Sequence, residues 1–435
     1  MSPELLLTIG MFGGLVFCII FGVSLAYALG GVAVITTLIL YGPGGLMPIV
    51  SGVFNYMWML LLAAVPLFIF IGVALSKTKI AEDLFNAFYL WSGSVRGGLA
   101  VGSCCLAAAL SAMTGNNAAS TVTTGLVGIP PMKQRGYKES IILGAIGGPG
   151  TMGILIPPSI TLIVIGMMTG QSIGKLFAGG MTSGLFIVFT FIIYILIRAW
   201  LDPSLCPAIG VQVTLREKIY ALKSIAFPLL IILSIMGTIF GGIATPTEAA
   251  SLGCVAVLLC VLVRGELSGK FIKETAYTTA VTTGMVLWIM FGAAGFVAVY
   301  SGGGGVAFMQ QFFLSSELNR WTLFVIMQGI TFLLGMFFDP MGIILLCVPI
   351  FYPICQTLGF DPIWFNLIFN INLCLGYITP PFGYCLFYLK AMCPEIPMIR
   401  IYESVLPYIV IMLVDMLIMT FIPEIITWFP NFIMR

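Results

Sequence analysis

Three stretches of this chain are each apolar over about 20 residues, the length that an α-helix needs to cross the hydrocarbon core of a bilayer. They cover residues 56–75, 179–201 and 405–428. Backbone groups inside a bilayer find no water, so such segments must satisfy their hydrogen bonds internally, as helices. Of the 435 residues, 60% are hydrophobic and 8% are charged, and the mean hydropathy is +1.13. The sequence therefore predicts an all-α polytopic membrane protein.

Two proline pairs interrupt apolar segments of this kind, in "GTMGILIPPSI" at residues 150–160 and in "CLGYITPPFGY" at residues 374–384. Proline has no backbone N–H and clashes with the carbonyl four residues earlier, so each pair is expected to break a helix within the membrane. The break leaves backbone carbonyl oxygens available there. A simple proline kink capped by nearby Ser or Thr is the alternative for either break alone, and it explains two matched breaks less well.

The two breaks are 223 residues apart, and the same offset relates other turn and breaking residues of the two halves. The matched pairs are Pro130 with Pro353, Gly136 with Gly359, Gly153 with Gly376, Ala26 with Ala249, Leu29 with Leu252 and Gly30 with Gly253. Five crossings and a re-entrant hairpin in the first copy place the second copy upside down. The sequence thus predicts two inverted-topology repeats, each with a re-entrant hairpin and a proline-broken helix, as in secondary transporters.

The expected domain organisation follows from these repeats. Repeat one covers 1–205, with scaffold helices over about 1–76, a hairpin over about 97–130, a broken helix over about 139–170 and a span over about 178–200. A cytoplasmic linker covers 206–223. Repeat two covers 224–435, with a hairpin over about 320–353, a broken helix over about 362–391 and a last span over about 405–428. Residues 80–92 are expected to form an amphipathic helix on the cytoplasmic surface.

Lys and Arg predict the orientation, because they accumulate in cytoplasmic loops. With a periplasmic N-terminus, 15 of the 18 Lys and Arg residues face the cytoplasm. The other three, Lys175, Arg320 and Arg435, face outward. We therefore expect a multi-pass protein with its N-terminus in the periplasm.

Each predicted hairpin carries a polar tip. The first tip lies in "LSAMTGNNAAS" at residues 110–120, and the second lies in "LGMFFDPMG" at residues 334–342. Carbonyl oxygens at the ends of half-helices are hard ligands that suit Na⁺, and N–H groups at the starts of half-helices suit an anion. A hairpin tip beside each broken helix therefore favours a secondary transporter whose free backbone oxygens suit Na⁺, and we expect no cofactor besides Na⁺.

The sequence contains few features that would support another function. The chain has no histidine, which removes haem ligation, copper sites and the commonest general base. Its 11 cysteines are expected to be small buried hydrophobic residues. The run "SGGGGV" from Ser301 has no Lys-Ser or Lys-Thr after it and so does not predict a phosphate loop. A membrane enzyme acting on lipids would show paired carboxylates or histidines at a membrane face. We expect no enzyme and no nucleic-acid partner.

Three acidic residues lie close to or within apolar segments. Glu248 follows Thr245 and Pro246 in the pattern of a capping box, which we favour over a role inside the membrane. Asp339 lies at the second tip, where a helix cap and a substrate or cation contact are equally good interpretations. Asp415 lies in the last span and is expected to face a neighbouring helix or a partner subunit rather than the transport pathway.

Three long motifs carry a resemblance to a known family. They are "GNNAASTVTTGLVGIPPMKQRGYKESIILGAIGGPGTMGILIPPSI", "GGIATPTEAASLG" and "GFDPIWFNLIFNINLCLGYITPPFGYCLFYLK". Together they resemble the large membrane subunit of tripartite ATP-independent periplasmic (TRAP) transporters, over nearly the whole chain. The resemblance implies an elevator-type transporter, similar to the ion transporter superfamily. It also implies sodium-coupled import of organic acid anions across the bacterial inner membrane. The implied partners are a periplasmic substrate-binding protein, a separate small four-helix membrane subunit and membrane lipid.

The resemblance also implies two sodium sites and a substrate site. Site one would use Ser111, Thr114, Gly153, Ile156 and Pro158, and site two would use Gly335, Phe338, Gly376, Thr379 and Pro381. The substrate is expected to contact Asn116, Asn117, Ser159, Asp339 and Phe382. Many family members have a Ser-Gly-Ser run at the first hairpin, where this chain has Ser-Ala-Met-Thr-Gly-Asn-Asn. The alternative is a stand-alone sodium/dicarboxylate symporter of similar architecture, which would need no binding protein.

Overall fold

The computed structural model describes residues 2–92, 95–207, 214–315 and 318–433, so part of the expected linker over 206–223 lies outside the described residues. Within them, the first half contains α1 (Pro3–Ile20), α2 (Leu25–Tyr41), η1 (Pro43–Leu46), α3 (Met47–Met57), η2 (Leu60–Ala63), α4 (Ala64–Ser76), α5 (Ile80–Ser92), α6 (Gly98–Thr114), α7 (Asn117–Gln134), α8 (Glu139–Gly150), η3 (Thr151–Ile154), α9 (Ile160–Thr169) and α10 (Ile173–Leu201).

The second half contains α11 (Leu215–Phe240), α12 (Pro246–Val263), α13 (Gly269–Gly302), α14 (Gly305–Ser315), α15 (Arg320–Gly335), α16 (Pro340–Thr357), α17 (Pro362–Ile378), α18 (Tyr384–Met392), α19 (Met398–Phe421) and α20 (Glu424–Ile433). The described residues form no strand. Six of these helices are long and apolar enough to cross a membrane, or seven if one bent pair counts as a single span. The chain is an all-α, multi-pass membrane protein.

The apolar segment over 56–75 is not one straight helix. α3 ends at Met57, Met59 has an extended backbone, and the chain bends by 63° before it continues into α4. Pro66 lies in the first turn of α4 and has no N–H to donate to the carbonyl four residues earlier. The stretch is therefore built of separate helical segments, although it is strongly apolar.

The last long helix also differs from the expected span over 405–428. α19 begins at Met398 and ends at Phe421, and α20 follows after a short break. Pro423 explains the break, because a proline disfavours helical backbone at the residue before it. That residue, Ile422, has φ −121° and ψ 74°.

Two helical hairpins have their tips at the predicted polar sequences. α6 packs against α7, and α15 packs against α16. Gly115 ends α6 with a positive φ of 58°, a conformation that glycine adopts without strain, and Asn116 caps α7. In the second hairpin α15 ends at Gly335 and Asp339 caps α16.

Both proline pairs lie between helices. Pro157–Pro158 lies between η3 and α9, and Pro380–Pro381 lies between α17 and α18. Both proline–proline peptide bonds are cis. The polypeptide is therefore non-helical at both predicted breaks.

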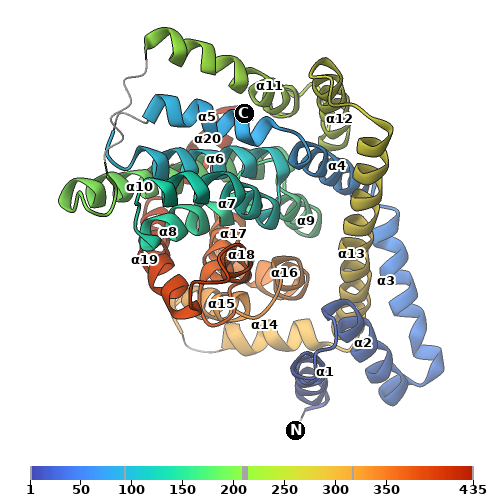
Figure 1. Ribbon diagram of the computed structural model, residues 1–435. Coiled ribbons are helices and arrows are strands. Elements are labelled where there is room, and N and C mark those ends of the chain that lie inside the picture. Colours follow the sequence, from blue (N-terminus) through green and yellow to red (C-terminus); the bar gives the residue numbers. More distant parts are fainter. Residues whose placement is uncertain (1, 93–94, 208–213, 316–317, 434–435) are drawn as a thin grey trace.

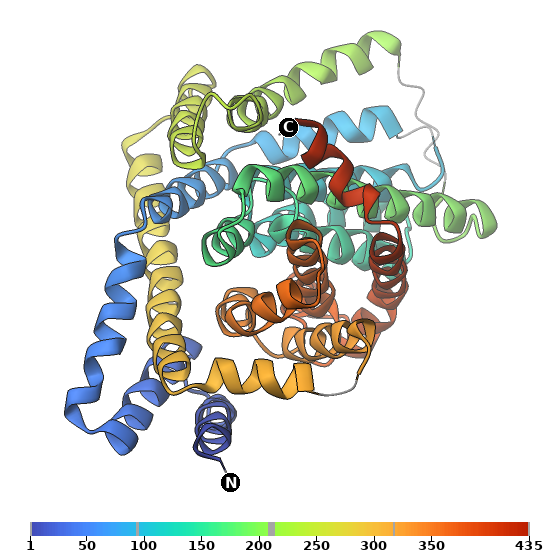
Figure 2. The same ribbon diagram turned by 180° about the vertical axis from the view of Figure 1, so that it is seen from behind.

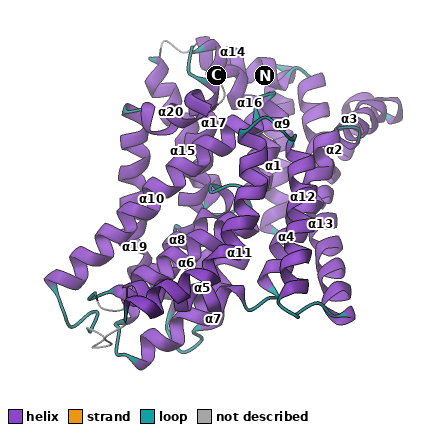
Figure 3. Ribbon diagram, turned by 90° about the horizontal axis from the view of Figure 1, so that it is seen from above, coloured by secondary structure: helices purple, strands orange, loops and turns teal. Residues whose placement is uncertain are grey.

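The hairpins and the broken helices gather in one bundle. Figure 1 shows α6–α9 and α15–α18 packed together, with α2, α3 and α13 along one side of them and α14 at the edge. Figure 2 shows the same arrangement from behind. α13 packs against α2, α3, α4 and α16, so it lies between the N-terminal helices and the bundle. In the perpendicular view of Figure 3, the two termini and α14 lie at one end, and α5 and α7 lie at the other.

Ion pairs join helix ends at the face that the charge distribution predicts to be cytoplasmic. Lys77 of α4 pairs with Glu274 of α13 at 3.3 Å. Arg264, which follows α12, pairs with Asp83 of α5 at 2.5 Å. A further pair joins Lys133 of α7 to Glu395, which precedes α19. Exposed pairs of this kind contribute little to stability, about 0–1 kcal/mol each, but they show which helix ends lie together.

Several smaller expectations are confirmed. α5 coincides with the helix expected over 80–92 and buries Ile80, Ala81, Leu84, Phe85 and Ala87. Glu248 accepts hydrogen bonds from the backbone N–H (2.7 Å) and the hydroxyl (2.8 Å) of Thr245, as a capping box requires. Asp415 is buried and accepts a hydrogen bond from Thr190 of the neighbouring α10 at 2.6 Å. Eight of the 11 cysteines are buried, and all 11 are free thiols.

Candidate functional site

Both hairpin tips line one cavity of about 100 Å³. The first hairpin contributes Gly115, Asn116 and Asn117, and the second contributes Asp339 and Met341. The opposite wall comes from α13, and the regions of both helix breaks complete the lining with Ile154, Ile160, Thr161 and Tyr377. Three of the five residues expected to contact substrate, Asn116, Asn117 and Asp339, therefore meet in one place.

The two tips share a backbone design. Asn116 Oδ1 accepts a hydrogen bond from the backbone N–H of Ala118 at 2.8 Å. Asp339 Oδ2 accepts one from the backbone N–H of Met341 at 2.9 Å. In both tips the side-chain oxygen of the cap therefore accepts a hydrogen bond from the backbone N–H two residues later in the chain, at the start of a half-helix. The two caps are 223 residues apart, and so are the two donors.

The first tip is bonded directly to the first break. Asn117 Oδ1 accepts a hydrogen bond from the backbone N–H of Ile154 at 3.1 Å, while its Nδ2 has no partner among the described residues. Gly153 lies so close to the tip that an added Cβ would be 2.7 Å from the carbonyl carbon of Asn116. A Cβ at Gly115 would be 2.4 Å from the carbonyl oxygen of Pro158. The tip and the break therefore form one packed unit.

The carbonyl oxygen of Ile154 holds the first break in place. It accepts hydrogen bonds from Ser159 Oγ (2.6 Å), Thr161 Oγ1 (2.7 Å) and Asn370 Nδ2 (2.6 Å). Asn370 comes from α17, so the second half of the chain supports the break of the first half. Ser159, which we expected to contact substrate, is fully buried and also caps α9 through the N–H of Leu162.

The expected ligands of sodium site one lie together around this break. In the described part of the chain, no hydrogen bond reaches the carbonyl oxygens of Gly153, Ile156 or Pro158. Ser111 Oγ lies 3.0 Å from Ser120 Oγ, which donates its own proton to the carbonyl of Ala107. Ser111 must then donate to Ser120, because a hydroxyl has one proton, and its lone pairs stay available. Thr114 is buried at the end of α6.

The expected ligands of sodium site two also lie together, and a glycine contact joins them as well. A Cβ at Gly376 would be 2.7 Å from Cα of Gly335, so α15 and α17 touch backbone to backbone there. Thr379 donates its hydroxyl proton to the carbonyl of Leu375 at 2.6 Å, which leaves the lone pairs of its oxygen free. Phe338 is half-buried against the core.

Two carbonyls of the second break already accept hydrogen bonds. The carbonyl of Gly376 accepts from the N–H of Thr379 at 3.1 Å, and the carbonyl of Pro381 accepts from the hydroxyl of Tyr402 at 2.8 Å. Phe382 is 50% exposed and packs on the ring of Phe337, with a centroid distance of 5.4 Å. It does not line the cavity between the tips.

Four residues near the cavity were missed by the sequence analysis. Thr161 follows the first proline pair, and Tyr377 precedes the second, so their proximity to the breaks was a usable signal. Asn370 and Thr282 gave no such signal, because each reaches the site from a helix that is distant in sequence.

A second cavity of about 260 Å³ adjoins the first. The two share Asn116, Ile160 and Thr282 in their walls. From there the second cavity follows α4 and α13 to Ser76 and Lys77. The space between the tips therefore shares a wall with a wider space that extends toward the face rich in Lys and Arg.

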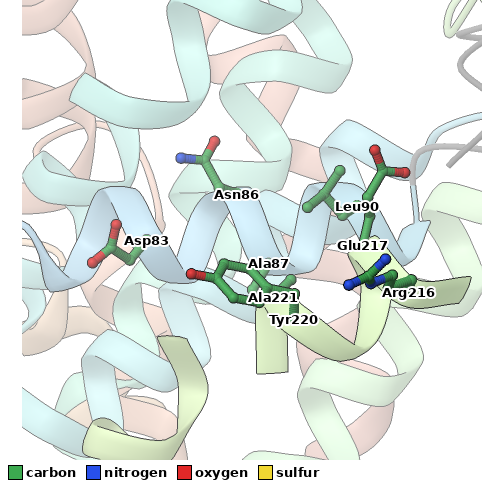
Figure 4. A pocket seen from close by; sticks show the side chains of 8 residues that line it. All are labelled: Asp83, Asn86, Ala87, Leu90, Arg216, Glu217, Tyr220 and Ala221. Atoms are coloured by element: carbon green, nitrogen blue, oxygen red, sulfur yellow. The ribbon is translucent and has the colours of Figure 1, made fainter. Parts of the chain in front are cut away.

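A separate hollow of about 420 Å³ lies between α5 and α11 (Figure 4). Its polar side chains include Asp83, Asn86 and Arg216, and hydrogen bonds from Thr214 hold the pKa of Glu217 below its usual range. None of the predicted sodium or substrate residues line it. We therefore place the candidate site between the hairpin tips and not in this larger hollow.

Known proteins resemble this chain along nearly its whole length. A family model described as the DctM component of tripartite ATP-independent periplasmic transporters matches residues 12–425. The C4-dicarboxylate TRAP transporter large permease protein DctM of Pseudomonas aeruginosa is 29% identical over 91% of this chain and 92% of its own. The ectoine/5-hydroxyectoine large permease UehC of Ruegeria pomeroyi is 34% identical over 84% of each. The crystal structure of the YdaH transporter of Alcanivorax borkumensis has a similar fold, with a TM-score of 0.65 and 14% identity over 98% of this chain and 99% of its own.

Proposed function

This chain belongs to the DctM family, the large permeases of tripartite ATP-independent periplasmic transporters, and on that premise we propose that it imports an organic acid anion together with Na⁺. The proposed location is the bacterial inner membrane, with the N-terminus in the periplasm. The chain is a transport component and not an enzyme.

The observation that carries the proposal is the meeting of both tips at one cavity beside both helix breaks. The breaks present backbone oxygens, which are ligands for a hard cation such as Na⁺. Asn117 lines the cavity with an amide group whose N–H bonds are unused in the described residues, and α7 and α16 both begin there. Helix starts and amide donors suit a carboxylate. The proposed cation and anion sites would thus be neighbours, which supports coupled transport.

The proposed mechanism is an elevator motion of two inverted repeats. The moving part would comprise α6–α9 and α15–α18, which pack as one bundle, and α13 would belong to the scaffold. The repeat is supported by the equal spacing of the two caps and of the two breaks. Bound Na⁺ would fix each tip to its break, and linkage then requires that Na⁺ also raise the affinity for the anion.

Two partners complete the proposed transporter. The family implies a small membrane subunit, and it implies a periplasmic protein that delivers the substrate. The stand-alone symporter is the alternative, and it differs in one measurable way. Uptake by the chain in proteoliposomes should need both partners, whereas the alternative predicts uptake without them.

Uptake against Na⁺ concentration is the main test, with K⁺ replacing Na⁺ to keep the ionic strength constant. The complete transporter would be offered succinate, as a C4-dicarboxylate, and ectoine, because large permeases for both classes resemble this chain. We expect saturable uptake of an organic acid that disappears without Na⁺. Uptake that follows a proton gradient and ignores Na⁺ would overturn the cation assignment and make Asp339 the leading coupling group.

The orientation can be tested by labelling single cysteines from outside intact cells. A cysteine at Lys175 should react, and a cysteine at Arg135 should not. The reverse result would overturn the proposed topology.

A further inference from the structure

One cationic side chain lies on the path that leads away from the candidate site. The two adjoining cavities are lined by two charged residues of the described chain, Asp339 between the tips and Lys77 at the far end of the wider cavity. Lys77 follows the last residue of α4, and its ion pair with Glu274 places it beside the first turns of α13. An anion that leaves the tips through the wider cavity would pass Lys77.

The wall of the path leads to this residue along one face of α13. Thr282 and Thr278 line the wider cavity, and Glu274 lies one turn farther toward the start of the helix. Residues four apart share a face of a helix, so the two hydroxyls and the carboxylate form a polar stripe. In the opposite direction α13 presents Met285 and Ile289, and there the wall of the narrow cavity is apolar. Of the α13 residues that line the two cavities, the polar ones therefore lie toward Lys77.

Glu274 lies between two lysines. Its Oε2 atom is 3.3 Å from Nζ of Lys77, and its Oε1 atom is 3.8 Å from Nζ of Lys270. If the ion pair between Glu274 and Lys77 breaks, Glu274 can therefore still pair with Lys270. The Lys77 side chain is 27% exposed and that of Glu274 is 49% exposed, so their attraction is partly screened by water and the exchange is inexpensive.

We propose that Lys77 is an anion-binding point at the mouth of the transport path, where it takes the carboxylate of the transported acid in exchange for Glu274. Lys270 then neutralises Glu274 while the anion is on Lys77. The proposal rests on the proposed transport of an organic acid and adds the place where that acid leaves the protein. A charge at such a rim acts mainly on association and release rates and on their dependence on salt.

The local potential can be measured without a transported substrate. Thr282→Cys places a thiol in the wall shared by both cavities. The complete transporter would be treated with sulfonatoethyl methanethiosulfonate, an anion, and with trimethylammonioethyl methanethiosulfonate, a cation. Mass spectrometry of the peptide that contains position 282 gives the modification rates by the anionic and the cationic reagent at this position. The measurement does not depend on modification of the other cysteines. Their ratio reports the charge along the path.

Lys77→Gln should lower the anion-to-cation rate ratio about two- to five-fold, the size of a partly screened charge contact. Glu274→Gln should raise the ratio, because it frees Lys77, and Lys77→Arg should leave it near the starting value. Lys79→Gln is the matched control, since Lys79 is exposed on the same helix end but does not line the path. The effect of Lys77→Gln should vanish at about 1 M salt, where the Debye length is about 3 Å.

Three results would overturn the proposal. They are no modification at position 282 by either reagent, an unchanged ratio in Lys77→Gln, and an equal change in Lys79→Gln. A fall that persists at high salt would show a change of structure and would count against it as well. Loss of sodium-coupled uptake would instead overturn the proposed function and leave this ratio intact, because the labelling needs neither Na⁺ nor substrate.

Discussion

The two helix breaks have the same place in their halves of the chain but are held by different means. The first break is buried along residues 151–160 and is fixed by side-chain hydrogen bonds to Ile154. The second break has a glycine contact as the first does, but it reaches the surface at Pro381 and Phe382, and the hydroxyl of Tyr402 holds its Pro381 carbonyl. A common backbone plan therefore carries two different sets of side chains.

The difference bears on which backbone oxygens can bind a cation. All three expected carbonyls of the first break are free of hydrogen bonds in the described residues, whereas two of the three in the second break are engaged. A carbonyl that already accepts a hydrogen bond has less electron density to offer Na⁺. For the two proposed sodium sites, we therefore expect tighter Na⁺ binding at the first break and weaker binding at the second.

The largest expected effect comes from separating a tip from its break. In Gly153→Ala the new methyl group would lie 2.7 Å from the carbonyl carbon of Asn116, and in Gly376→Ala it would lie 2.7 Å from Cα of Gly335. Overpacking against backbone costs about 1–3 kcal/mol, and the contact must open to relieve it. Sodium-dependent uptake should fall about ten- to hundred-fold in both variants.

Gly284→Ala is the control for both glycine variants, because an added Cβ at Gly284 meets no atom within 4 Å. All three proteins should be compared at equal amounts in the membrane. Normal uptake in Gly153→Ala would contradict the tight contact between the first tip and the first break.

The positions of the breaks and caps could be predicted because they depend on local chemistry. Proline removes a hydrogen bond wherever it occurs, and Asn116 and Asp339 cap the helices that follow them directly. The bend at Met59 could not be predicted from composition, because every residue around it is apolar. The contacts of Asn370 and Tyr402 with the breaks could not be predicted either. Each residue lies on a different helix from the break it supports, and sequence spacing does not encode such contacts.

The next effect tests the inferred order of the two sodium sites. Thr114→Ala and Thr379→Ala each remove one neutral oxygen ligand, at a cost of about 1–3 kcal/mol or roughly ten- to hundred-fold in affinity. The weaker site sets the Na⁺ concentration for half-maximal uptake. Thr379→Ala weakens the limiting site, so it should raise the Na⁺ concentration for half-maximal uptake by about the full ten- to hundred-fold. Thr114→Ala weakens the tighter site, so it should raise this concentration less, unless the loss makes that site the weaker of the two.

Thr238→Ala provides the comparison for these variants, because its hydroxyl bonds only to carbonyls of its own helix, Ser234 (2.7 Å) and Ile235 (2.9 Å). The readout is uptake against Na⁺ concentration at constant ionic strength. A larger shift in Thr114→Ala than in Thr379→Ala would reverse the order of the sites.

A smaller effect should follow from making the two caps chemically alike. Asn and Asp cap helices equally well, so Asn116→Asp keeps the cap and adds a second carboxylate beside Asp339. The added charge should repel an anionic substrate and raise the substrate concentration for half-maximal uptake about ten-fold. Asp339→Asn, which keeps the cap and removes the charge, should not raise it. If Asn116→Asp improves uptake, the substrate carries a positive charge where the two tips meet.

The smallest effect isolates one carbonyl of the second break. Tyr402→Phe removes the hydroxyl that donates to the carbonyl oxygen of Pro381 at 2.8 Å and leaves the ring in place. A hydrogen bond of this kind contributes about 0.5–1.5 kcal/mol, so its loss should make the oxygen a better ligand and lower the Na⁺ concentration for half-maximal uptake about two- to ten-fold. The change should appear because the weaker site limits uptake, and it should persist in the Thr379→Ala background, where the same site limits uptake still more. A rise in the Na⁺ requirement would mean that Tyr402 positions the Pro381 carbonyl for the cation instead of competing with it. The second break would then depend on a neighbouring helix for its geometry, as the first break depends on Asn370.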